Sequence, residues 1–238
     1  MATNQEALDQ IKQYLNESYT RSTTYSVPKK NDLTFGNTVK KLEHAKIFYI
    51  DMRKSRKILT DASDFWSVKI HKAFLRAIIH CIEKRDGHLR SFNGDGILAF
   101  FIDDNAASKA VRAAMDIKGY VNEINDILVK SSKNKIDFGI GIAQGPVMIA
   151  KSGKGGDDQT KQDLIWIGIA LYVAVELSEL GKTSKNIWVS DNILNSVIKE
   201  GDPLKTLKHE GEWIWFYEQK TLNNGYQKVH HTTWYFNV

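Results

Sequence analysis

Apolar residues recur along the chain with two different periods. In some stretches they stand three or four positions apart, which is typical of amphipathic helices. In others they alternate or form short unbroken runs, which is typical of strands. Helices are predicted over residues 5–19, 61–85, 105–129, 169–180 and 191–199. Strands are predicted over residues 46–51, 136–143, 147–150, 186–190, 211–218 and 232–238, with a hairpin over residues 88–102 and a short apolar run over residues 165–168. This order predicts an α+β fold of ferredoxin-like type, with a central mixed or antiparallel sheet and helices on one face.

Turn signals separate several of these elements. The run Asn93-Gly94-Asp95-Gly96 is typical of a tight hairpin turn, because Asn-Gly and Asp-Gly tolerate the positive φ that such turns need. Gly145-Pro146 predicts a turn between two strands, and residues 223–225 predict another before the last strand. Residues 20–42 show no period, so residues 1–44 are expected to form an N-terminal helix and arm, and residues 45–238 the main domain.

The composition is that of a globular chain. Of its 238 residues 42% are hydrophobic and 26% are charged, and no apolar run is long enough to span a membrane. The start of the chain lacks the layout of a secretory signal, and the single cysteine, Cys81, is expected in the core of a cytoplasmic protein. A net charge of +5 favours an anionic ligand such as a nucleotide, but it does not indicate nucleic-acid binding.

Two aspartates stand at the ends of strand-like runs. Asp51 ends the run 46–51, and Asp95 lies in the hairpin turn. They are either ordinary turn residues or a site for a hard cation, since Mg²⁺ prefers a few carboxylate oxygens together with substrate phosphates. The basic turn after Asp51, residues 52–56, can hold phosphate oxygens or can simply be solvated. The basic loop 151–156 lacks the spacing of a Walker A motif.

Four segments together resemble the class III nucleotidyl cyclases. They are residues 47–53, 91–100, 138–147 and 166–168, in the order and at the spacings of that family. The resemblance covers roughly residues 45–220 and implies the catalytic domain of such a cyclase. It also implies a nucleoside triphosphate substrate, two Mn²⁺ or Mg²⁺ ions per site, attack of the ribose 3′-OH on the α-phosphate, and a homodimer with sites shared across its interface.

The family's metal-binding positions are kept here, whereas its purine-reading positions are not. The two metal-binding aspartates fall on Asp51 and Asp95, and the backbone carbonyl that also binds metal falls on Met52. Ser91 stands where purine cyclases have a base-reading lysine, and Ile165 stands where they have an aspartate. Polar side chains that hydrogen-bond a base carry much of the discrimination between nucleotides. The loss of these side chains therefore argues against ordinary recognition of ATP.

Two further departures fall on the helix 169–180. In the family an asparagine orients the ribose and an arginine stabilises the transition state; the aligned residues here are Tyr172 and Glu176. Tyr172 can hydrogen-bond the ribose and narrow the pocket, whereas Glu176 cannot replace a cation. The missing charge is expected from one of four residues: Arg53, Arg56, Arg90 or Lys208.

With a narrow pocket that lacks the side chains that read a purine base, the sequence resembles the pyrimidine cyclases of the bacterial Pycsar anti-phage systems. These compact class III homologues make cyclic UMP or cyclic CMP. Tyr49 shares a strand face with Asp51 and is placed to contact base or ribose, and Arg53 is a further candidate substrate-binding residue.

A uridylate cyclase, a phosphorus–oxygen lyase, is therefore expected, with a cytidylate cyclase, a purine cyclase and a catalytically silent nucleotide-binding or dimerisation module as alternatives. A ferredoxin-like nucleic-acid binder is disfavoured, because the strands lack the basic and aromatic motif of such modules.

Overall fold

The structure is a computed structural model that describes residues 4–55, 57–58, 64–154, 159–182 and 184–238. Its contacts divide the chain into two units. The smaller comprises Met1–Glu43 and Pro146–Gly168, and the larger comprises His44–Gly145 and Ile169–Val238. Strands β2 (Thr38–Arg53) and β5 (Asp137–Gly153) run through both units. The expected boundary between residues 44 and 45 therefore stays a prediction.

A mixed sheet organises the chain. Its path runs β10-β11-β7-β5-β2-β4-β3, with β5 and β7 parallel and the β2–β4, β3–β4, β7–β11 and β10–β11 pairs antiparallel. The strands not yet bounded are β3 (His88–Asn93), β4 (Gly96–Phe101), β7 (Ile187–Ser190), β10 (Phe216–Leu222) and β11 (Gly225–Thr232). The predicted class, α+β around a central mixed sheet, is confirmed.

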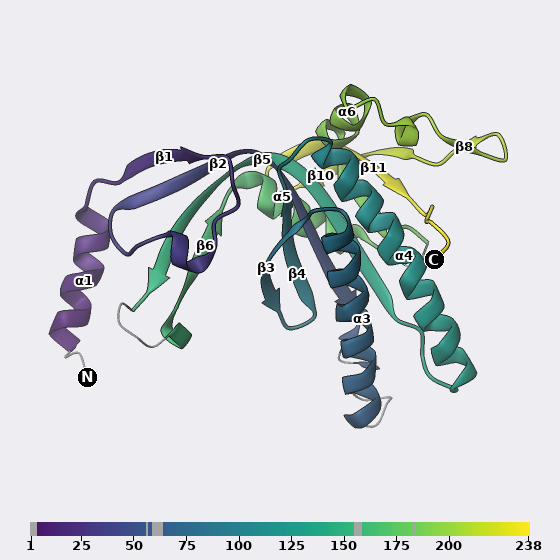
Figure 1. Cartoon of the computed structure of the whole chain (residues 1–238), viewed down its shortest axis with the longest axis horizontal. Helices are drawn as coiled ribbons and strands as arrows, with labels where there is room; N and C mark the ends of the chain where they lie inside the picture. The colour runs from purple at the N-terminus through teal and green to yellow at the C-terminus, as the bar shows by residue number, and fades with distance from the viewer. Residues whose placement is uncertain (1–3, 56, 59–63, 155–158, 183) are drawn as a thin grey trace. The chain divides into compact units, whose positions relative to one another are not determined.

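One face of this sheet carries the hydrophobic core. Two long helices, α3 (Asp64–Lys84) and α4 (Ala106–Lys130), pack side by side against it (Figure 1). The shorter helix α6 (Asp191–Lys199) adds Ile193 and Val197 to the same cluster. Cys81 of α3 is fully buried there, as expected, and burial raises the pKa of its thiol to about 12. No helix of the described residues is long and apolar enough to cross a membrane.

Helix α5 (Ile169–Leu180) packs on the other side of β5. Phe138 and Ile140 of β5 belong to the core, so the alternate residues Gly139 and Gly141 face away from it. A β-carbon at Gly141 would stand only 1.9 Å from the carbonyl oxygen of Ala174 on α5. The glycines thus allow α5 to lie directly on the strand.

The smaller unit is built on the ends of β2 and β5. Strand β1 (Thr20–Thr24) runs parallel to β2, and β6 (Gln162–Ile167) runs antiparallel to β5. Helix α1 (Asn4–Asn16) has no buried residue. Short 3₁₀ turns are also present: η1 (Lys30–Asp32) and η2 (Gln159–Lys161) in this unit, and η3 (Pro203–Lys205) in the larger one.

Several predicted boundaries were wrong. Residues 20–42 are not all irregular, because β1 and the start of β2 pair there. The predicted turn at Gly145-Pro146 is absent: β5 is continuous, and it pairs with β7 at residues 140–142 and with β6 at residues 148–153. Pro146 lies between these two ladders, so its missing N–H costs neither of them a hydrogen bond.

The C-terminal strands also differ from their prediction. The expected strand 211–218 is divided into β9 (Glu212–Trp213), which pairs with β8 (Lys208–His209), and the start of β10. The last strand is β11, not residues 232–238, and the predicted turn at residues 223–225 joins it to β10. The first residues of the predicted helix 61–85 lie outside the described residues, and α3 matches the rest of it.

Candidate active site

Alternation along β2 places its polar residues on one face. Phe48, Ile50 and Met52 are buried in the core, and the residues between them point to the opposite face. Tyr49 and Asp51, on that opposite face, are half-buried. Arg53, the next residue on this face, is also half-buried. The period of the strand therefore brings a phenol, a carboxylate and a guanidinium into one row, as the sequence predicted for Tyr49 and Asp51.

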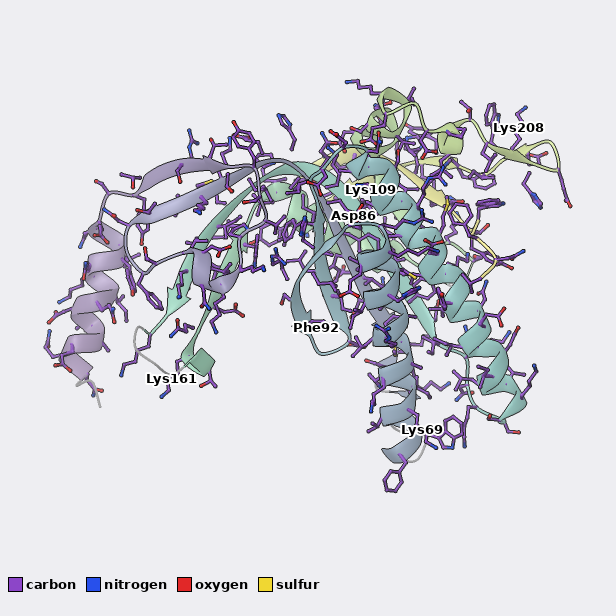
Figure 2. The ribbon with its side chains drawn as sticks, in the orientation of Figure 1. Lys69, Asp86, Phe92, Lys109, Lys161 and Lys208 are labelled. Atoms are coloured by element: carbon purple, nitrogen blue, oxygen red, sulfur yellow. The ribbon has the colours of Figure 1, made fainter. Side chains whose placement is uncertain are left out.

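The hairpin β3–β4 brings Asp95 to the end of this row. Asn93 pairs with Gly96, so Gly94 and Asp95 form a two-residue turn, and Gly94 takes φ +66 at its first position, as glycine does in a type II′ turn. Phe92, labelled in Figure 2, marks the turn end of β3. Ile50 of β2 pairs with Ile97 of β4, so Asp51 at the end of β2 lies near Asp95 in the turn before β4.

The two carboxylates are close enough to influence each other. Burial raises the pKa of Asp51, the charge of Asp95 raises it further, and the Arg53 guanidinium offsets part of this rise. The Oδ2 atom of Asp95 is buried and has no hydrogen-bond partner. A buried carboxylate oxygen without a donor, beside a second carboxylate, fits a divalent cation. No group of three or more His, Cys, Asp or Glu residues that could hold a metal occurs in the described chain, so any such site here rests on this pair and on backbone or substrate oxygens.

A cross-strand row lies beside the carboxylates. Tyr49 pairs with Leu98 of β4, and Leu98 pairs with Ser91 of β3, so all three side chains share one face. Burial raises the pKa of the Tyr49 phenol, and the charges of Asp51 and Asp95 raise it further. Tyr49 is therefore a neutral hydrogen-bonding group at neutral pH.

Helix α5 is tied to this face by Arg53. The Arg53 guanidinium donates a hydrogen bond to the Ser178 carbonyl on α5, while its Nε atom is buried without a partner. Tyr172, earlier on the same helix, is 59% exposed. Ile165 lies on β6 in the smaller unit and is 42% exposed. Within the larger unit the structure thus brings Tyr49, Asp51, Arg53, Ser91 and Asp95 onto one face, while Tyr172 and Ile165 present exposed side chains.

Glu176, at the family's arginine position, has a structural contact. Its carboxylate accepts hydrogen bonds from the backbone N–H of Asn223, at 3.2 and 3.3 Å, and from the Asn223 side-chain amide. Asn223 begins the turn between β10 and β11, so Glu176 anchors this turn to α5. The sequence showed that Glu176 could not serve as a cation; it contained no signal for the partner, which comes from a distant part of the chain.

The other candidates for the missing cation lie in different places. Arg90 donates to the carbonyl of Leu89 at 2.6 Å on β3. Lys208, labelled in Figure 2, lies over the Trp213 ring at 4.5 Å in the β8–β9 hairpin. Arg56 lies outside the described residues. Arg53 is the candidate that stands on the same strand face as Asp51.

The contact between Glu176 and Asn223 makes a testable prediction. Replacing Glu176 by Gln, or Asn223 by Ala, should lower the free energy of unfolding by about 1 kcal/mol each, because a charge-assisted bond at a partly exposed site is lost. The double variant should lose less than the sum of the two, as expected for direct partners. Urea denaturation of the four proteins measures this coupling. Fully additive losses would show that the pair contributes no interaction energy.

Comparison with known proteins finds relatives that are named uridylate cyclase. No family model matches the chain. A protein from Burkholderia cepacia named uridylate cyclase is 29% identical over 74% of this chain and 80% of its own length. A uridylate cyclase from Xanthomonas perforans is 25% identical over 87% of this chain and 85% of its own length.

Solved structures agree on the fold. The adenylyl cyclase CyaB from P. aeruginosa superimposes with a TM-score of 0.65 at 14% identity, covering 82% of this chain and 95% of the other. The guanylyl cyclase Cya2 gives a TM-score of 0.65 at 17% identity, over 83% and 94% of the two chains. The guanylate cyclase domain of RhGC from Catenaria anguillulae, solved in complex with GTP, gives 0.61 at 17% identity, over 83% and 100%. The resemblance to class III nucleotidyl cyclases is confirmed, and the named relatives support a nucleotidyl cyclase.

Proposed function

We propose that this chain is a uridylate cyclase that converts UTP into 3′,5′-cyclic UMP and pyrophosphate. The observation that carries the proposal is the pair Asp51 and Asp95: the buried Oδ2 atom of Asp95 lacks a donor, and burial together with the charge of Asp95 raises the pKa of Asp51. Relatives named uridylate cyclase favour UTP as the substrate. As in the Pycsar systems that the sequence resembles, the cyclic product would act as a messenger in defence against phage.

The proposed metal site consists of the two carboxylates and the Met52 carbonyl. Asp51 and Asp95 fit two divalent ions, Mn²⁺ or Mg²⁺, because each carboxylate can offer oxygens to both ions and the buried Oδ2 atom of Asp95 has no hydrogen-bond partner. When bound, such ions stabilise negative charge on the attacking and leaving oxygens of an in-line displacement. Arg53 adds a fixed positive charge on the same strand face.

The remaining site residues would position the nucleotide. Tyr49, kept neutral by burial and by the carboxylates, can hydrogen-bond the base or ribose, and its ring restricts the space for a base. Ser91 is in the same cross-strand row. It offers a small hydroxyl at the position where purine cyclases have the longer side chain of a base-reading lysine. Tyr172 and Ile165 are exposed, which suits residues that complete a site on a second copy of the chain. We therefore propose a homodimer with sites at its interface.

A product assay tests the proposal. Purified protein is incubated with Mn²⁺ and each of UTP, CTP, ATP and GTP, and the products are separated by chromatography and identified by mass. Cyclic UMP from UTP, at a rate well above the rates for the other three nucleotides, is expected. A preference for CTP would assign a cytidylate cyclase, and a preference for ATP or GTP a purine cyclase. No product from any triphosphate would leave only a silent binding module.

Tyr49 provides a prediction about selectivity. Tyr49→Ala should reduce the preference for UTP over ATP, measured as the ratio of kcat/KM values, by about tenfold, because a wider pocket no longer disfavours the larger base. Tyr49→Phe keeps the ring and should retain most of that preference. If both variants keep the ratio of the unaltered protein, Tyr49 does not limit the size of the base.

A further inference from the structure

An aromatic pocket lies between α6 and the C-terminal strands of the larger unit. Its volume is about 310 Å³, within the range of about 300–1,000 Å³ that is typical of small-molecule sites. The residues that line this aromatic pocket are Leu194, Thr206, Trp213, Trp215, Tyr217 and His230. Four of these six side chains carry rings and none has a carboxylate, an ammonium or a guanidinium, so the pocket suits a flat, uncharged ligand.

The aromatic pocket lies on the sheet face opposite to the two aspartates. Tyr217 of β10 pairs with His230 of β11, and His230 pairs with Val189 of β7. Directly paired residues share a face, and Val189 belongs to the core, so the pocket is on the face that carries the core helices. Asp51 lies on the face of β2 that is turned away from the core. A ligand in the aromatic pocket is therefore distinct from one that binds at the carboxylates.

Buried contacts fix the base of the pocket. Leu194 of α6 is 1% exposed, and Trp215 is 9% exposed. The Trp215 indole N–H donates to the Leu204 carbonyl at 3.0 Å, so the ring cannot turn without breaking this bond. The apolar base is thus formed before any ligand binds, which lowers the cost of binding.

Three polar side chains can hydrogen-bond the edge of a ring. His230 Nε2 lies 2.8 Å from Asp191 Oδ1, and this hydrogen bond lowers the pKa of Asp191. Asp191 is therefore ionised at neutral pH and accepts the Nε2 proton, which makes Nδ1 of a neutral His230 an acceptor. Thr206 Oγ1 donates to the Pro203 carbonyl at 3.2 Å, so its oxygen can also accept, and the Tyr217 hydroxyl can donate or accept. A heteroaromatic ring, with donors and acceptors on its edge, matches these groups.

The hairpin that carries Trp213 is a second, independent observation. Within the described chain, strands β8 and β9 form a sheet of their own beside the main one, and all four of their residues are exposed (Figure 1). Glu210 and Gly211 between them take φ +53 and +85, the signs of a type I′ turn. A lone hairpin is marginally stable, and this one adds no strand residue to the core. Its structural result is to hold the half-exposed Trp213 at the aromatic pocket.

We propose that the aromatic pocket binds a small, uncharged heteroaromatic molecule that stacks on Trp213 and Tyr217. Both rings are half-exposed, and a flat ligand would cover them while its edge meets His230 and Thr206. A lining without cations disfavours a nucleotide, because its phosphates would find no charged partner there. The assignment does not rest on the proposed function, since the pocket and the carboxylates lie on opposite faces of the sheet.

Titration with quinazolin-4-one, an uncharged bicyclic heteroaromatic probe, tests the aromatic pocket. Each of the six tryptophans gives one indole N–H signal in a two-dimensional NMR spectrum of the nitrogen-labelled chain, and single Trp→Phe variants identify these signals. The signals of Trp213 and Trp215 should shift along one saturation curve, whereas that of Trp66 on α3 should stay in place. Trp213→Ala should weaken binding about tenfold, and Trp213→Phe, which keeps a ring, only about twofold.

A matched control removes an aromatic ring elsewhere. Phe65 is exposed on α3 outside the pocket, and Phe65→Ala should bind the probe as the unaltered protein does. Absence of a saturable shift at Trp213 and Trp215, or equal affinity in Trp213→Ala and Phe65→Ala, would overturn the assignment. So would a dimer that dissociates in Trp213→Ala but not in Phe65→Ala, measured by light scattering, because the pocket would then receive a second copy of the chain.

Discussion

Replacing Asp51 by Asn is expected to abolish cyclisation of UTP and, at the same time, to stabilise the metal-free protein. Turnover should fall by at least about 10³-fold, because the loss of a ligand to catalytic ions removes several kcal/mol of charge stabilisation in the transition state. The melting temperature without metal should rise by about 2–4 °C, since relief of the carboxylate repulsion is worth at most about 1 kcal/mol at this half-exposed position.

The sign of the stability change follows from the pKa of Asp51. Burial and the charge of Asp95 raise this pKa in the folded protein, so the folded state favours the protonated carboxyl. That contribution to stability is fully present below the unfolded pKa of about 3.9 and is lost as the pH rises through the higher folded pKa. At neutral pH the ionised carboxylate of Asp51 therefore lowers the stability of the folded protein. The neutral amide of asparagine avoids this loss.

A matched control separates this effect from a general effect of charge. Asp104, an exposed aspartate just before α4, can be changed to Asn in the same way. Asp104→Asn should leave both turnover and melting temperature unchanged, and Asp95→Asn should behave as Asp51→Asn does. Turnover of Asp51→Asn within tenfold of the unaltered protein, or a fall in its melting temperature without metal, would contradict the account.

Gly141→Ala is expected to destabilise the fold severely. The added β-carbon would stand 1.9 Å from the Ala174 carbonyl oxygen and 2.6 Å from the Ser178 backbone nitrogen, and backbone atoms cannot move aside as a flexible side chain can. Overpacking of this kind costs about 3 kcal/mol, which is a fall of about 6–12 °C in melting temperature for a chain of this size. Urea denaturation measures the loss, and activity should fall as well because α5 moves off the strand.

Gly211→Ala is the comparison for this substitution. A β-carbon there would meet nothing within 4 Å, but the residue has φ +85, so about 1 kcal/mol of backbone strain is expected. Gly141→Ala should therefore cost clearly more than Gly211→Ala. Equal losses would mean that α5 does not lie as closely on β5 as the structure places it.

The elements with strong local signals could be predicted from the sequence. The ranges of α5 and α6 match their predictions, because apolar residues recur at helical spacing in both segments. The hairpin turn around Asp95 followed from its Asn-Gly and Asp-Gly pairs, and the two-residue period of β2 placed Tyr49 beside Asp51. Residues whose position depends on local geometry were thus assigned to the correct strands and faces.

Features that depend on distant partners could not be predicted in this way. The turn expected at Pro146 is absent because two different strands pair with β5 on either side of it, and the sequence does not show which strands become neighbours. The contact of Glu176 with Asn223 joins residues 47 positions apart.

The central claim is that Asp51 and Asp95 together hold divalent ions beneath the triphosphate. Electron paramagnetic resonance of Mn²⁺, titrated into the protein with a UTP analogue that cannot cyclise, measures this most directly. We expect two bound ions per site in the unaltered protein and a loss of bound Mn²⁺ in both Asp51→Asn and Asp95→Asn, with Asp104→Asn unchanged. Equal Mn²⁺ binding in the unaltered protein and both site variants would contradict it.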